Sequence, residues 1–68
     1  MNKLKDRLKE RRLEMRFSQD ELAKISGVSR TTISMLETGE QTVTKSSTIL
    51  ALAKALKIKP QKLLDPES

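Results

Sequence analysis

The sequence contains no cysteine and no histidine. Without cysteine, neither disulfide bonds nor thiolate metal sites are available. The absence of histidine removes the commonest zinc ligand and the commonest general base. We therefore expect no metal site and no cofactor, and the stability of the fold has to come from packed aliphatic side chains.

Aromatic residues and long apolar runs are also scarce. Phe17 is the single aromatic residue, so the stacking platforms that proteins use to bind RNA or single-stranded DNA are lacking. No stretch approaches the roughly 20 apolar residues that a membrane span needs. The N-terminus shows no secretory signal. We expect a cytoplasmic protein without a membrane partner.

Length and charge narrow the possible functions further. A chain of 68 residues predicts a single domain, residues 1–68, near the lower size limit for a self-sufficient core. No pair of carboxylates and no nucleophile–base arrangement stands out, so we expect neither an enzyme nor a small-molecule substrate. Fourteen Lys and Arg against nine Asp and Glu give a formal charge of +5. This charge favours polyanions, nucleic acid first and an anionic membrane surface second. Binding to a membrane surface would also require a broad exposed apolar face, whereas the apolar stripes of this chain are expected to pack its helices together.

The apolar residues recur at helical intervals throughout, and no segment alternates with the period of a strand. The pattern predicts an all-α fold. Proline is favoured at the first position of a helix, and Pro60 marks the start of the last one. The expected helices span residues 3–16, 19–26, 30–38, 45–56 and 60–64.

Residues 18–39 have the signals of two short helices joined by a tight turn. Ser18 and Glu21 have the spacing of a capping box, which starts a helix at its N-terminus. Gly27 suits the left-handed position that ends this helix, and Gly39 suits the same position in the next helix. Ser29 can cap the second of the two helices. This arrangement is the layout of a helix-turn-helix unit. Its inward-facing residues are expected to be Leu22, Ala23, Ile25, Ile33 and Leu36.

The same segment resembles a known family. The residues that carry the resemblance are QDELA at 19–23, GVS at 27–29, Ile-Ser at 33–34, Leu-Glu at 36–37 and Gly39. They are similar to the Cro and lambda-repressor type of helix-turn-helix protein, also called the XRE family, over about residues 3 to 64. The resemblance implies a compact five-helix lambda-repressor-like DNA-binding domain. In such a domain the second helix of the motif enters the major groove of DNA.

Four residues of that second helix are candidates for reading bases. The resemblance places Arg30, Thr31, Ser34 and Met35 at the base-reading positions. If Ile33 and Leu36 are buried, the exposed face near the start of the helix also includes the first three of these. An arginine can donate two hydrogen bonds to one guanine, and the threonine and methionine side chains can contact a thymine methyl group.

Other residues are expected to contact the DNA backbone. The resemblance assigns a phosphate contact to Gln19, at the first position of the first motif helix. Thr42, Thr44 and Lys45, in the loop after the second motif helix, are expected to follow the backbone together with Ser29. Such contacts position a protein without reading sequence.

The resemblance also implies an ion pair between Arg12 and Glu37 that orients the second motif helix. At one position the chain departs from the family, because Arg16 replaces a common glycine. A residue other than glycine would be strained in a left-handed conformation, so the first turn is expected to differ. The loop after Gly39 is expected to be about one residue longer than usual, with Val43 near the place of a common proline.

Together these features predict a sequence-specific regulator of transcription that binds double-stranded DNA. The resemblance implies a phage- or prophage-type repressor, acting as a homodimer on a pseudo-palindromic operator whose half-sites lie about 34–36 Å apart. Ile58, Leu63 and Leu64 suit either the dimer face or the core of the monomer. The alternative is an antitoxin-like protein that binds DNA and a toxin partner. The chain can equally be a whole regulator or the DNA-binding part of a longer one.

Overall fold

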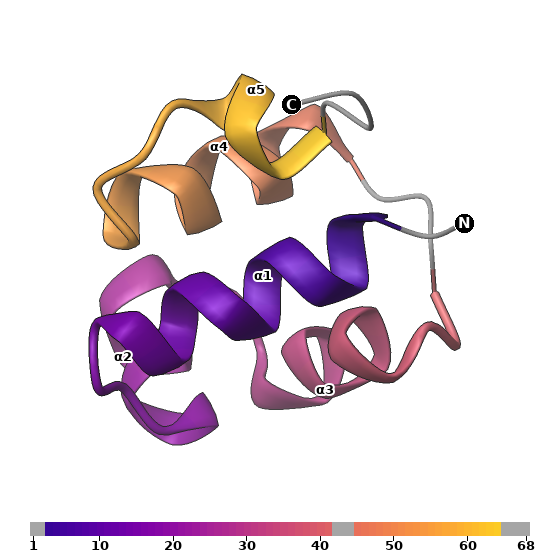
Figure 1. Cartoon of the computed structure of the whole chain (residues 1–68). Coiled ribbons are helices and arrows are strands. Elements are labelled where there is room, and N and C mark those ends of the chain that lie inside the picture. The colour runs from indigo at the N-terminus through magenta and orange to yellow at the C-terminus, as the bar shows by residue number, and fades with distance from the viewer. Residues whose placement is uncertain (1–2, 42–44, 65–68) are drawn as a thin grey trace.

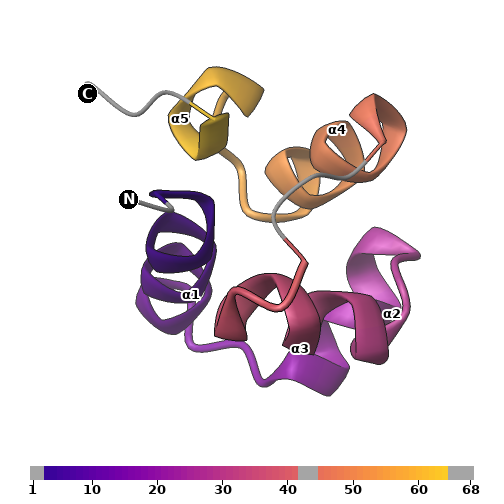
Figure 2. The same ribbon diagram turned by 90° about the vertical axis from the view of Figure 1, so that its right-hand side faces the viewer.

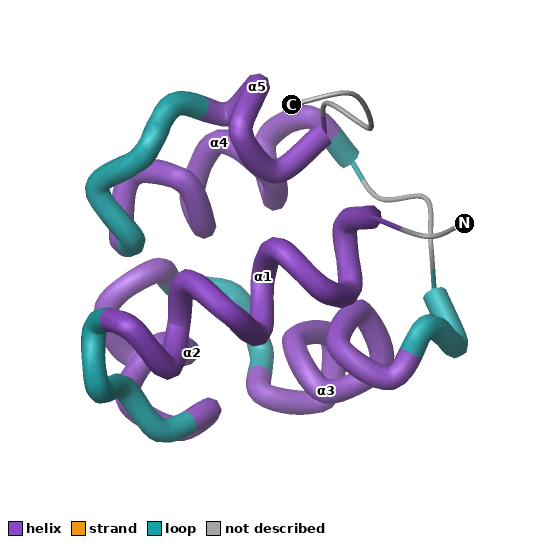
Figure 3. The backbone as a smooth tube through the Cα atoms, viewed as in Figure 1, coloured by secondary structure: helices purple, strands orange, loops and turns teal. Residues whose placement is uncertain are grey.

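Five helices and no strand are found in the described part of the chain, residues 3–41 and 45–64 of the computed structural model, which confirms the predicted all-α fold (Figure 3). Nothing is assigned to the remaining residues. The helices are α1 (Lys3–Glu14), α2 (Gln19–Ser26), α3 (Arg30–Thr38), α4 (Ser46–Ala55) and α5 (Pro60–Leu64).

The five helices surround one core as a closed ring of contacts. Helix α1 packs against α3 and α5, α2 packs against α3 and α4, and α4 packs against α5. Figure 2 shows this ring, with α1 and α2 on opposite sides and α3 between them. In Figure 1, α1 lies between the α4–α5 pair and the α2–α3 pair. The motif helices therefore form one side of the molecule.

The core inside this ring is aliphatic. Leu8, Leu22, Leu36, Leu52 and Leu63, one from each helix, have no exposed surface. Burying such a side chain contributes about 1.5–3 kcal/mol. The remaining buried apolar residues are Leu4, Ile33, Ile49, Ala53 and Leu56. Every helix is therefore fixed to its neighbours by at least one fully buried leucine.

Helix α2 begins and ends at the residues expected from the sequence. The Ser18 hydroxyl oxygen accepts a hydrogen bond from the Glu21 amide (3.0 Å), and a Glu21 carboxylate oxygen accepts one from the Ser18 amide (2.8 Å). This is the predicted capping box. Gly27 follows with φ 78°, and its amide donates to the carbonyl oxygen of Ala23.

The turn and α3 follow the same pattern. Residues 27–29 connect the two helices, and the Ser29 hydroxyl oxygen accepts a hydrogen bond from the Thr32 amide (3.1 Å). Helix α3 ends at Thr38, and Gly39 follows it with φ 88° and donates its amide to the Met35 carbonyl oxygen. The short turn leaves little freedom in the angle between α2 and α3.

Helix α1 ends at Glu14, two residues before the predicted end at Arg16. Arg16 adopts the left-handed conformation, with φ 61°, so the turn keeps the form that glycine usually provides. The Arg16 amide donates to Leu13 O and the Phe17 amide donates to Arg12 O, at 3.0 and 3.1 Å. These two bonds form the C-terminal motif that normally contains glycine. The expectation of a different first turn is therefore wrong: the hydrogen bonds hold the conformation despite its cost.

Helix α4 ends in the same way without glycine. It spans Ser46–Ala55, one residue shorter at each end than the predicted 45–56. Lys57 has φ 57°, and the amides of Lys57 and Ile58 donate to the carbonyl oxygens of Lys54 and Ala53. The reversal brings Pro60 to the first position of α5, as predicted.

One predicted core residue is instead on the surface. Ile25 of α2 is 55% exposed, whereas Leu22 of the same helix is fully buried. Successive helical residues are about 100° apart, so Ile25 lies about 60° from Leu22, on the side away from Ala23, which packs against the core. Within residues 3–41 and 45–64, no helix has the length and apolar character that crossing a membrane requires.

Candidate nucleic-acid interface

Helix α3 has one face in the core and another toward solvent. Ile33, Leu36 and Glu37 are buried. Arg30 and Thr31 are exposed, whereas Ser34 and Met35 are partly buried. The four predicted base-reading residues therefore lie together on the part of α3 that the core does not use.

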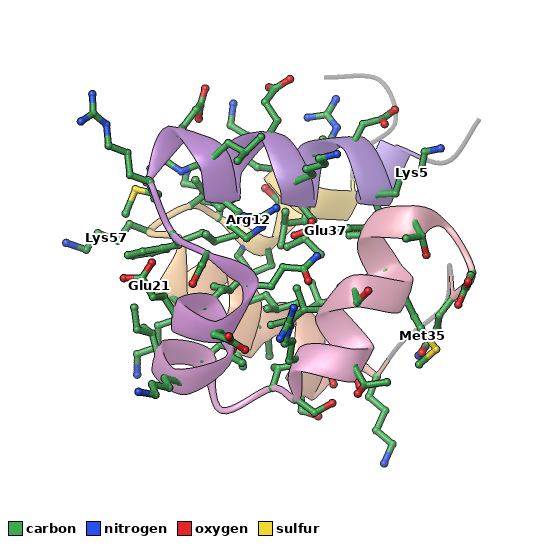
Figure 4. The ribbon with its side chains drawn as sticks, turned by 90° about the horizontal axis from the view of Figure 1, so that it is seen from below. Lys5, Arg12, Glu21, Met35, Glu37 and Lys57 are labelled. Carbon is green, nitrogen blue, oxygen red and sulfur yellow. The ribbon has the colours of Figure 1, made fainter. Side chains whose placement is uncertain are left out.

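Met35 lies toward the C-terminal end of this surface. In Figure 4 its side chain lies on the outer side of α3, away from the Arg12–Glu37 pair. Its carbonyl oxygen accepts the Gly39 and Gln41 amides, so its backbone is held by the turn that ends the helix. A partly buried thioether at this place can make apolar contacts but cannot donate a hydrogen bond.

The buried face of α3 is anchored to α1 by a bidentate ion pair. The Arg12 guanidinium donates from Nε to Glu37 Oε2 at 2.7 Å and from Nη2 to Glu37 Oε1 at 3.0 Å. Both side chains are largely buried, and Figure 4 shows them pointing toward each other between α1 and α3. Arg12 Nη1 also donates to the carbonyl oxygen of Phe17 at 2.8 Å. The expected pair is thus present, and it ties α3 to both α1 and the turn after α1.

The ion pair also affects the titration of Arg12. The hydrogen bond to Glu37 raises the pKa of Arg12 above its usual value, and the negative charge of Glu37 acts in the same direction, while burial acts against both. The net shift therefore favours the charged guanidinium of Arg12. The anchor therefore behaves as a fixed structural element.

Gln19 joins the same anchor from α2. Its side-chain amide donates from Nε2 to Glu37 Oε1 at 3.2 Å. Glu37 thus connects α1, α2 and α3 through a single carboxylate. The sequence predicted a phosphate contact for Gln19, which stays a prediction. The structure adds a direct contact with α3, because the Gln19 amide group helps to hold the Glu37 carboxylate.

The other predicted backbone contacts differ in how far the structure describes them. The Ser29 hydroxyl caps α3 and donates to the Thr32 hydroxyl oxygen at 2.9 Å. Lys45 is exposed at the residue before α4. Thr42, Thr44 and the loop position of Val43 lie outside the described residues.

One contact of the surface was not predicted from the sequence. Arg30 Nη1 lies 3.3 Å from Asp20 Oδ1, and the two side chains are 63% and 67% exposed. Asp20 lies in the first turn of α2 and Arg30 in the first turn of α3. These opposite charges were the one signal in the sequence that could have predicted the ion pair. The pairing itself depends on the angle at which α2 and α3 cross.

The comparisons with known proteins agree with this geometry. The helix-turn-helix family pattern matches residues 8–63. The structure is similar to that of the restriction-modification controller protein C.AhdI from Aeromonas hydrophila, with a TM-score of 0.84 and 37% sequence identity. The alignment covers 91% of this chain and 92% of that chain. A comparison with curated proteins finds no match.

The family match includes the capping box, the Gly27 turn and the whole of α3. The similarity to C.AhdI extends over nearly the full length of both chains. The protein therefore belongs to the XRE-type helix-turn-helix family of DNA-binding proteins.

Proposed function

We propose that this protein is a sequence-specific regulator of transcription that inserts α3 into the major groove of double-stranded DNA. Arg30, Thr31, Ser34 and Met35 would read base edges there. Gln19 and the N-terminus of α2 would contact the phosphate backbone, because amide groups at a helix start attract anions. Ser29, Thr42, Thr44 and Lys45 would contribute further backbone contacts.

The division of α3 into two faces is the observation that supports this proposal. Ile33 and Leu36 hold the helix in the core, and Glu37 fixes it to α1 and α2. Arg30 and Thr31 remain exposed at the end of the helix that enters the groove first in this family. A helix that is fixed through its buried face can present the side chains of its exposed face to base edges in a constant orientation.

We also propose that two copies bind a pseudo-palindromic operator. One short recognition helix contacts only a few base pairs, and related half-sites one turn apart double the contacts. Leu63, one of the residues considered for the dimer face, is fully buried in the monomer core, and Ile58 packs against that core. Leu63 is therefore unavailable to a dimer face unless the monomer core rearranges.

The structural match to C.AhdI bears on which genes the protein regulates. C.AhdI is a restriction-modification controller protein, and the high similarity over nearly the whole chain supports a controller of restriction-modification genes as the specific role. A phage- or prophage-type repressor, predicted from the sequence, would use the same surface. An antitoxin-like role would require a toxin partner, and co-purification with one would favour it.

Selection of bound sites from random duplex DNA tests this proposal directly. We expect the purified protein to enrich one consensus with two-fold symmetry. We also expect its affinity to fall steeply with salt, because phosphate contacts release counterions. Arg30→Ala should lose about 1–3 kcal/mol of discrimination at one base pair per half-site, whereas Lys9→Ala removes the same charge from α1 and should not. Failure to enrich any sequence would overturn the proposal.

A further inference from the structure

An ion pair crosses the outer surface from α2 to the first residue of α3. Asp20 Oδ1 lies 3.3 Å from Arg30 Nη1, and both side chains remain mostly exposed. An exposed pair of this kind adds little to folding stability. Its position is more informative, because it joins the residue expected to read a base to the start of the neighbouring helix.

The atoms involved leave Arg30 able to bind a base. The guanidinium carries five N–H groups in a fixed plane. Asp20 lies beside Nη1, so the edge formed by Nε and Nη2 stays available. Two N–H groups on one edge are what a bidentate contact with guanine O6 and N7 requires. The carboxylate can therefore stay beside the guanidinium while Arg30 binds guanine.

The carboxylate also changes which DNA atoms are attractive. An arginine on a flexible stem binds any phosphate as a point of negative charge, without regard to sequence. A carboxylate 3.3 Å from the guanidinium repels a phosphate that approaches the same atoms, and it limits the directions that the side chain can explore. Both effects weaken binding to random DNA more than binding to a correctly placed guanine.

We propose that Asp20 is a specificity-determining residue, which orients Arg30 for one base and lowers its attraction to phosphate. The inference rests on the proposed function, since it assumes that Arg30 reads a base. It makes an unusual prediction about a carboxylate on a DNA-binding surface. Removal of the Asp20 carboxylate should strengthen binding to random DNA and weaken discrimination between the operator and other sequences.

The test compares Asp20→Asn with a matched control. Asp6→Asn removes the same carboxylate from the first turn of α1, where Asp6 is exposed. For each protein the Kd is measured on the selected operator, on the operator changed at the base pair assigned to Arg30, and on random duplex DNA. We expect Asp20→Asn to lower the discrimination ratio about 3- to 10-fold and to tighten random binding about 2- to 5-fold at low salt. Asp6→Asn should keep the ratio of the wild type.

A double-variant cycle shows whether Asp20 acts through Arg30. In the Arg30→Ala background, Asp20→Asn should leave the discrimination ratio unchanged. An unchanged ratio for Asp20→Asn in the wild-type background would overturn the inference, and so would an equal loss in both backgrounds. Far-UV circular dichroism separates these results from a loss of folding. If the wild type selects no sequence at all, the proposed function fails instead, so the two failures are distinguishable.

Discussion

Replacing both members of the Arg12–Glu37 ion pair should cost far less stability than replacing either one. The variants are Arg12→Met, Glu37→Leu and the double variant, which keep roughly the volume of the native side chains. Arg12→Met leaves a nearly buried Glu37 carboxylate that keeps, among the described residues, the hydrogen bond from Gln19 at 3.2 Å. Glu37→Leu leaves a guanidinium with the Phe17 carbonyl as its acceptor at 2.8 Å.

Removing one partner of a buried ion pair costs about 3–5 kcal/mol, whereas an apolar pair of similar volume is often neutral. A chain of this length has a total free energy of unfolding of about 3–10 kcal/mol. Each single variant should therefore lose a large part of its stability, with Tm falling by about 12 °C or more. The double variant should stay close to the wild type, which corresponds to a coupling energy of several kcal/mol.

Urea denaturation followed by far-UV circular dichroism measures these differences. The chain has no tryptophan or tyrosine, so the helical signal is the natural probe of unfolding. If the double variant loses as much stability as the sum of the singles, the coupling energy is zero, the two side chains act independently, and the reasoning from desolvation is wrong. A loss below about 1 kcal/mol for either single variant would show that water enters the site.

The remaining predictions concern packing and backbone conformation. Leu52→Ala removes a fully buried side chain and should cost about 2–5 kcal/mol in urea denaturation, whereas Leu50→Ala, at a residue 55% exposed, should change stability by about 0.5 kcal/mol or less. Arg16→Gly should raise Tm, because relief of the left-handed strain of about 1–2 kcal/mol exceeds the entropic cost of glycine. Gly27→Ala should lower Tm although no atom beyond the two adjacent residues lies within 4 Å of the added Cβ, since the cost comes from the left-handed backbone conformation. Equal melting temperatures for wild type and Arg16→Gly would show that Arg16 carries no strain.

The helix ends were predictable where a local motif specifies them. The Ser18–Glu21 capping box, Gly27 and Gly39 act through backbone groups only a few residues away, so their geometry follows from spacing alone. The ends at Arg16 and Lys57 were not, because both adopt left-handed conformations that their residue types disfavour. There the hydrogen bonds and the packing of the next segment outweigh local preference.

Contacts between helices were harder to predict than the helices themselves. The Arg12–Glu37 pair was expected only through the family resemblance, since the residues are 25 positions apart. The Asp20–Arg30 pair depends on the crossing of α2 and α3, which no local pattern encodes. Ile25 was placed in the core because apolar residues usually are, but a helix of eight residues buries only a narrow stripe.

The two faces of α3 also bear on how DNA preference can change. Arg30 and Thr31 are exposed, while Ile33, Leu36 and Glu37 supply the contacts that hold the helix in place. New side chains can therefore be introduced at the exposed positions without repacking the interior. Under the proposed function, a change of operator and the maintenance of the fold then become nearly independent requirements, so target preference could diverge in steps that each leave a folded protein.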